Sequence, residues 1–179
     1  MPTPQRVRYT KIADLVDRLI GKNGITGPAV PVEKIAKGEG IIVTKKHLDD
    51  DTAGFLLRSG GMKFIGVNQS QASTRQRFTI AHELGHALLH EGEELHVDKN
   101  FRINFRDVVS SLATDVEEIE SNTFAAWLLM PSRFLIKQIT SEHLDIDDGD
   151  EVAKLAGRYQ VSQQAMTYRL ANLAAHGRV

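Results

Sequence analysis

Residues 82–86 read His-Glu-Leu-Gly-His, a spacing that suits metal-assisted hydrolysis. Residues four apart share one face of an α-helix, so His82 and His86 can present two imidazole nitrogens to one ion. Glu83 directly follows the first histidine and is near enough to take a proton from a water on that ion without becoming a ligand. Two histidines with a neighbouring carboxylate form the arrangement that a zinc hydrolase needs, and we interpret Glu83 as its catalytic base.

The residues around this motif predict the helix that must position it. Residues 78–90 are largely apolar with helical periodicity, and Ser73 with Gln76 resembles a capping box that starts the helix upstream. His90 continues the i, i+4 row, and we interpret it as a second-sphere or rim residue. The alternative is a histidine pair that only makes hydrogen bonds in the core.

A catalytic zinc site with two histidines needs a third protein ligand and an open position for water. The candidates lie on a second predicted helix within residues 115–131. Glu118 and Asn122 are four apart on one face, so we choose Glu118 as the ligand and expect Asn122 to support the ligand shell from the second sphere. Glu120 lies on a different side and is the runner-up, while Glu117 is assigned to capping. An ordinary solvated acidic helix start is the alternative for each carboxylate.

Two segments of the chain resemble the ImmA/IrrE family of zinc metallopeptidases. They are RFTIAHELGHALLH at 77–90 and EIESNTFAAWLLMP at 118–131, the second against a family pattern close to E-x-E-A-N-x-F-A-A-x-L-L-M-P. Ser121 stands where that pattern usually has alanine, which is a small residue replacing another small residue.

The resemblance implies a gluzincin-like HExxH site in which His82 and His86 bind zinc, Glu83 is the catalytic base and Glu118 is the third ligand. It also implies a protein substrate, typically a helix-turn-helix repressor whose cleavage releases a stress or mobile-element programme.

Composition limits the other possibilities. The chain has 179 residues, of which 41% are hydrophobic, with no cysteine and a net charge of −1. This length can bury one good core, and the charge gives no global electrostatic case for nucleic-acid or membrane partners. Without cysteine there are no disulfides or thiolate zinc sites. The N-terminus lacks the apolar core of a signal peptide, and no apolar run is long enough to span a bilayer, so we expect a cytoplasmic protein without a membrane partner.

The expected fold is α+β, with a mainly helical zincin-like metallopeptidase core over 1–140 and a helical extension over 141–179 packed on it. The front third predicts helices over 12–20 and 31–37, followed by three short strands. The strands are Ile41–Lys45, Thr52–Arg58 and Met62–Asn68, with a hairpin turn between the last two. An exposed edge of this three-stranded sheet can hold a substrate segment as an added strand; a purely structural sheet is the alternative.

Residues 91–113 show no clear periodicity and are interpreted as a loop beside the cleft. Such a loop can supply a cation or imidazole that stabilises an oxyanion. The candidates for this role are His96, Arg102 and Arg106, together with His90 at the rim. A plain solvated loop is the alternative, and the sequence does not identify which residue acts.

The tail, residues 152–173, resembles a helix-turn-helix pair in which Val161 and Ser162 turn and cap, and Gln160 stands where glycine is common. Four basic residues against one acidic residue give residues 151–179 a net charge of +3, which is mild for a phosphate-binding surface. We therefore favour two helices packed on the core over direct DNA binding.

Two functions from different classes follow. The first is an intracellular zinc-dependent endopeptidase that cleaves a protein, and the second is a non-catalytic regulator that binds DNA or a repressor. The intact Glu83 favours the first, because a pure binder has no need of a general base beside the metal.

Overall fold

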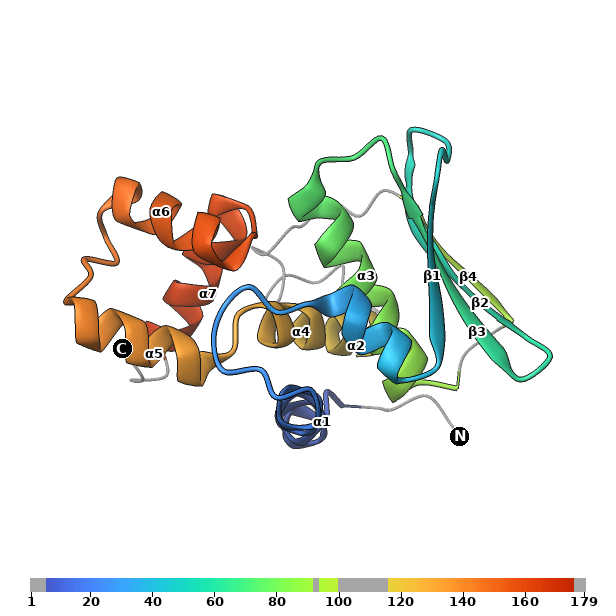
Figure 1. Cartoon of the computed structure of the whole chain (residues 1–179), viewed down its shortest axis with the longest axis horizontal. Helices are drawn as coiled ribbons and strands as arrows, with labels where there is room; N and C mark the ends of the chain where they lie inside the picture. Colours follow the sequence, from blue (N-terminus) through green and yellow to red (C-terminus); the bar gives the residue numbers. More distant parts are fainter. Residues whose placement is uncertain (1–5, 92–93, 100–115, 176–179) are drawn as a thin grey trace.

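Helices precede and follow a small sheet in the computed structural model, which describes residues 6–91, 94–99 and 116–175 (Figure 1). In chain order the elements are α1 (Tyr9–Lys22), α2 (Val32–Gly38), β1 (Ile41–Lys46), β2 (Thr52–Ser59), β3 (Met62–Asn68), α3 (Ser73–Leu89), β4 (Leu95–Lys99), α4 (Val116–Leu129), α5 (Ser132–Glu142), α6 (Gly149–Tyr159) and α7 (Gln163–Ala175). The predicted α+β class, mainly helical with a small sheet, is confirmed.

The sheet has the order β1-β3-β2-β4, so it contains one strand more than the three that the sequence predicts. β1 runs parallel to β3, whereas β2 is antiparallel to both β3 and β4. Gly60 and Gly61 adopt φ values of 58° and 78° between β2 and β3, which is the left-handed pair that a tight hairpin turn requires. β4 lies within the segment predicted as a loop and forms one edge of the sheet. The helices lie to one side of the sheet (Figure 1).

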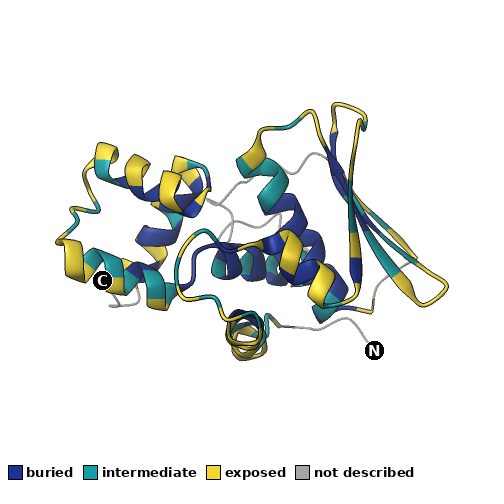
Figure 2. Cartoon of the chain, in the orientation of Figure 1, coloured by how far each residue is buried: buried dark blue, intermediate teal, exposed yellow. Residues whose placement is uncertain are grey.

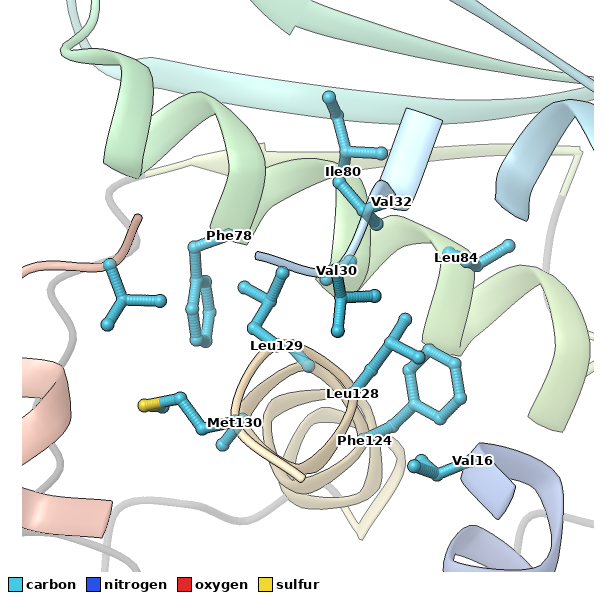
Figure 3. Packing of buried hydrophobic residues seen from close by; sticks show 14 of the residues in the cluster. Val16, Val30, Val32, Phe78, Ile80, Leu84, Phe124, Leu128, Leu129 and Met130 are labelled. Atoms are coloured by element: carbon cyan, nitrogen blue, oxygen red, sulfur yellow. The ribbon is translucent and has the colours of Figure 1, made fainter. Parts of the chain in front are cut away.

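The centre of the core is α3, in which every residue from Phe78 to Ala87 is buried (Figure 2). A helix buried on all sides carries no polar stripe, which explains the continuous apolar run around the motif. Side chains of α4, among them Phe124 and Leu128, meet those of α3, and Val16 of α1 lies nearby (Figure 3). No helix in the described part of the chain combines the length and hydrophobicity needed to cross a bilayer.

The contact between α3 and α4 depends on Gly85. A Cβ atom at this position would lie 3.1 Å from Phe124 Cδ1 and 3.1 Å from the backbone Cα of Ser121. These distances are shorter than ordinary van der Waals contacts, and a backbone atom cannot rotate out of the way. Gly85 therefore permits an approach of the two helices that any larger residue would oppose.

Three cations from different elements bind the carbonyls at the C-terminal end of α3. Arg58 Nη2 of β2 donates to His86 O at 3.0 Å, Lys63 Nζ of β3 donates to Ala87 O at 2.5 Å, and Arg8 Nη2 donates to Leu89 O at 3.3 Å. The end of a helix carries partial negative charge and unpaired carbonyls, so positive side chains there stabilise it.

The start of α3 differs from the prediction. The helix begins at Ser73, its N-cap is Ala72, and no side chain caps it. The predicted capping box is wrong, because Gln76 Nε2 donates instead to the carbonyls of Gln69 and Gln71 in the preceding turn.

The tail forms the helix pair that the sequence predicts. Gln160 adopts the left-handed conformation with φ 54°, and Ser162 Oγ accepts a hydrogen bond from Ala165 N at 3.2 Å. Apolar side chains of both helices and of the turn between them are buried, namely Leu155, Tyr159, Val161, Met166 and Leu170. Arg169, one of the four basic residues of the tail, is also buried. Its Nε donates to Met130 O at 3.1 Å, and its guanidinium lies over the Trp127 ring.

We predict that Gly85→Ala destabilises the protein, although alanine favours an α-helix by about 1 kcal/mol over glycine. Overpacking a tight core contact costs about 1–3 kcal/mol, which outweighs that gain. Urea denaturation measures the difference. Gly157→Ala is the matched control, because no atom lies within 4 Å of its added Cβ and the same substitution should stabilise α6. A Gly85→Ala protein as stable as Gly157→Ala would contradict the close-approach argument.

A second prediction compares the two arginines of the tail. Arg169→Ala should cost about 1–3 kcal/mol in the free energy of unfolding, because it removes a donor from the buried Met130 carbonyl. Arg158 pairs with Glu142 at the surface, with side-chain exposures of 45% and 39%, so Arg158→Ala should cost clearly less than Arg169→Ala. Equal, small effects on thermal unfolding would mean that Arg169 does not anchor the tail.

Candidate metal centre

Three side chains from two helices bring their ligand atoms together. The Nε2 atoms of His82 and His86, one turn apart on α3, lie 3.1 Å from each other. Glu118 of α4 reaches both, with Oε2 3.4 Å from His82 Nε2 and Oε1 3.0 Å from His86 Nε2. Ligand atoms bound tetrahedrally to zinc at about 2.0–2.1 Å are separated by roughly 3.3 Å. The spacing and the nitrogen and oxygen donors therefore fit one zinc ion.

The protonation states also suit a metal. Burial lowers the pKa of His86 to about 3, because a charged imidazole is poorly solvated there, and the neutral form is the one that binds metals. Burial alone would raise the pKa of Glu118, but its close contacts with the His82 and His86 imidazoles outweigh that effect and lower the pKa below its usual range. The site thus offers a neutral imidazole at His86 and an ionised carboxylate at Glu118.

Asn122 supports His82 from the side away from the ligand group. Its Oδ1 lies 2.9 Å from His82 Nδ1, and an amide oxygen can only accept a hydrogen bond. With this assignment of the amide, the proton of His82 is on Nδ1, and Nε2 presents its lone pair to the ligand group. Asn122 thus lies behind a candidate ligand, on the side where a second-sphere partner would contact it.

Glu83 is fully buried on α3 beside His82. Its charge acts on Arg58 of β2: burial lowers the pKa of Arg58, and the Glu83 carboxylate counteracts that effect. The predicted base is therefore buried and close enough to Arg58 of β2 for its charge to act there.

His96 joins the group from β4, the strand that the sequence did not predict. Its Nε2 lies 3.4 Å from Glu118 Oε1, and its ring centroid lies 4.2 Å from that of His86. One ligand atom from each of His82, His86, His96 and Glu118 falls within 4.8 Å of the others. The His96 side chain is 31% exposed, so it faces both the ligand group and solvent.

Glu120, the runner-up for the third ligand, lies elsewhere. Its carboxylate is fully buried and accepts hydrogen bonds from Arg8 N at 2.7 Å and Arg8 Nε at 2.9 Å. Its Oε2 lies 3.0 Å from His90 Nε2. Burial alone would raise the pKa of Glu120, but the hydrogen bonds from Arg8 and His90 hold it at about 2. His90 is buried as well, so it occupies a second-sphere position and not an exposed rim.

Two predicted rim residues, Arg102 and Arg106, lie outside the described residues. Sequence reasoning missed Arg8, Arg58 and Lys63, because nothing in their local sequence indicates contact with a helix some tens of residues away. The sequence of β4 does contain a pattern typical of a strand, because apolar Leu95 and Val97 alternate with His96 and Asp98.

Comparisons with known proteins identify the family of the chain. The family model described as the IrrE N-terminal-like domain, Peptidase_M78, matches residues 36–171. The chain is 29% identical over 148 residues to "Uncharacterized immunity region protein 2" of Bacillus phage phi105, covering 83% of this chain and 85% of that protein. It is 33% identical over 111 residues to "Radiation response metalloprotease IrrE" of Deinococcus deserti, covering 62% of this chain.

Some relatives are much longer. The chain spans 37% of the Deinococcus protein. It is also 28% identical to the phage-like element PBSX protein XkdA of Bacillus subtilis, and the match covers 70% of this chain and 56% of that protein. A solved structure of a Mycobacterium tuberculosis transcriptional regulator shares the fold, with a TM-score of 0.61 and 17% identity over 90% of this chain and 46% of that one. Because the family model covers well over half of the sequence, the chain belongs to the ImmA/IrrE family of metallopeptidases.

Proposed function

We propose that the protein is an intracellular zinc-dependent endopeptidase in which His82, His86 and Glu118 hold the metal and Glu83 is the catalytic base. The observation that carries the proposal is the convergence of two Nε2 atoms and one carboxylate at separations of 3.0–3.4 Å. Three protein ligands leave a fourth position open, which distinguishes a catalytic zinc site from a structural one.

Zinc, when bound, supplies a Lewis acid that polarises the scissile carbonyl and lowers the pKa of the attacking water. Glu83 accepts the proton from that water and delivers it to the nitrogen of the leaving amine. Its burial keeps the carboxylate away from bulk water. His96, at the edge of the ligand group, donates a hydrogen bond to the oxygen on which charge develops.

The substrate we propose is an extended segment of a protein that adds to the sheet beside β4. In the described residues β4 pairs with β2 alone, and it is the strand that carries His96. A segment bound along this edge would gain backbone hydrogen bonds and pass close to the metal group. Leu95 and Val97, which are 50% and 39% exposed, would offer apolar contacts on the outer face of the strand.

The specific target we propose is a helix-turn-helix repressor whose cleavage starts a stress or mobile-element response. Support comes from relatives whose names refer to a phage immunity region and to a radiation response. The alternative, a regulator that only binds DNA or a repressor, requires no proton transfer by Glu83. Loss of function in Glu83→Gln therefore separates the two.

We expect the purified protein to bind about one zinc, and Glu118→Gln and His82→Ala to lose it. Glu120→Gln should keep more zinc than Glu118→Gln, because Glu120 faces Arg8 and not the ligand group. His96→Ala should also keep the metal, since it leaves three ligands in place. Metal analysis after dialysis measures each value. Zinc loss in Glu120→Gln with retention in Glu118→Gln would reverse the ligand assignment.

For Glu83→Gln we expect the metal and the fold to remain while peptide-bond hydrolysis falls at least ~10²–10⁴-fold, since an amide cannot move the proton. The protein encoded by the neighbouring gene is the first substrate to test, and gel electrophoresis with and without a chelator detects cleavage. Normal cleavage by Glu83→Gln would rule out the proposed base.

A further inference from the structure

A chain of buried polar groups continues from the metal site to the surface through residues that the proposed chemistry does not use. His86 Nδ1, the ring nitrogen facing away from the ligand group, lies 3.3 Å from His90 Nδ1. His90 Nε2 lies 3.0 Å from Glu120 Oε2, and Glu120 is held by three donors of Arg8. The side chains of His90 and Glu120 are 1% and 0% exposed.

The hydrogen positions in this chain follow from its outer end. Glu120 is paired with the Arg8 guanidinium and is therefore an acceptor only, so His90 Nε2 must carry a hydrogen. In the tautomer whose single ring hydrogen is on Nε2, His90 Nδ1 is an acceptor. His86 Nδ1 is then the donor between the two rings. As a result His86 Nε2 has no hydrogen and its lone pair points at His82 and Glu118.

We propose that Arg8, Glu120 and His90 are positioning residues that select the metal-binding tautomer of His86. This inference rests on the proposed function, because it assigns to His86 Nε2 a metal to bind. Ligating histidines almost always donate their second ring N–H to an outer partner, and loss of that partner typically reduces metal affinity 10–100-fold. His82 has Asn122 in this role; His86 has a histidine that is itself oriented by a carboxylate.

The arrangement also explains why α4 carries Glu118 and Glu120, two residues apart, with different partners. Glu118 turns to the metal group, and Glu120 turns to the support of the second ligand. The backbone N–H and the guanidinium of Arg8, immediately before α1, tie this support to the N-terminal helix. One end of α1 thus contributes to a metal site formed by α3 and α4.

The test uses the full chain and two variants of His90. Gln in His90→Gln can accept a hydrogen bond from His86 Nδ1 and donate one to Glu120, whereas Leu in His90→Leu has a similar size and can do neither. Zinc affinity is measured by competition with a chelator. We expect a 10–100-fold loss in His90→Leu and a clearly smaller loss in His90→Gln. His47→Leu, at an exposed histidine that contacts Ser70, is the control and should match the wild type.

A spectroscopic measurement detects the tautomers directly. Its outcome depends neither on the stability of the variants nor on zinc binding. Nitrogen NMR of the ¹⁵N-histidine-labelled, zinc-free protein should show His86 protonated on Nδ1 and His90 protonated on Nε2 alone. Arg8→Gln, which changes a partly exposed residue, should weaken this preference and lower zinc affinity in the same direction as His90→Leu.

Equal zinc affinities for His90→Leu and wild type, or a His86 protonated on Nε2, would overturn the tautomer assignment. A His90 protonated on both nitrogens would also overturn it. These results differ from failure of the proposed function, in which the wild type would bind no zinc although His86 carries its hydrogen on Nδ1.

Discussion

The close contact of α3 with α4 at Gly85 is the constraint on which the site depends. A residue with a side chain there would meet Phe124 and the backbone of Ser121. Ser121 is followed by Asn122 and lies one turn from Glu118, so the same contact that fixes the helix spacing fixes how far Glu118 stands from His82 and His86. Distances of 3.0–3.4 Å between ligand atoms leave little tolerance, because metal–ligand bonds vary by only about 0.2 Å. The glycine inside the motif is therefore part of the geometry of the site and not a spacer.

Buried charges and unpaired carbonyls on α3 and α4 need partners of opposite charge, and these partners come from outside the two helices. Arg58 and Lys63 on the sheet and Arg8 before α1 bind the final carbonyls of α3, and Arg8 also neutralises Glu120. An uncompensated buried charge would shift its pKa and become neutral. Because the compensating residues come from three separate parts of the chain, the metal site links the sheet, the N-terminal helix and the central helix pair. Their cooperation explains how α3 can be buried on all sides while carrying two histidines and a glutamate.

Much of this could be read from the sequence, for identifiable reasons. The i, i+4 spacing places His82 and His86 on one face without knowledge of the fold, and the same argument joins Glu118 to Asn122 and separates Glu120 from both. The hairpin follows from paired glycines, and the tail helices follow from apolar periodicity. The partners of buried polar groups could not be predicted: Arg8 reaches Glu120 across 112 positions, and no local pattern encodes such a contact. β4 was missed because a short strand with charged neighbours resembles a loop. For the same reason the position of His96 beside the metal group was not predicted. The capping box at Ser73 was wrong because the loop carbonyls compete for the Gln76 amide.

The central claim is that α3 and α4 hold one zinc between His82, His86 and Glu118. X-ray diffraction from zinc-loaded crystals of the full chain, recorded on both sides of the zinc absorption edge, tests it most directly. The account predicts one anomalous peak at about 2.0–2.2 Å from the Nε2 atoms of both histidines and from a carboxylate oxygen of Glu118. A peak bonded to Glu120 in place of Glu118, or no peak between the two helices, would contradict it.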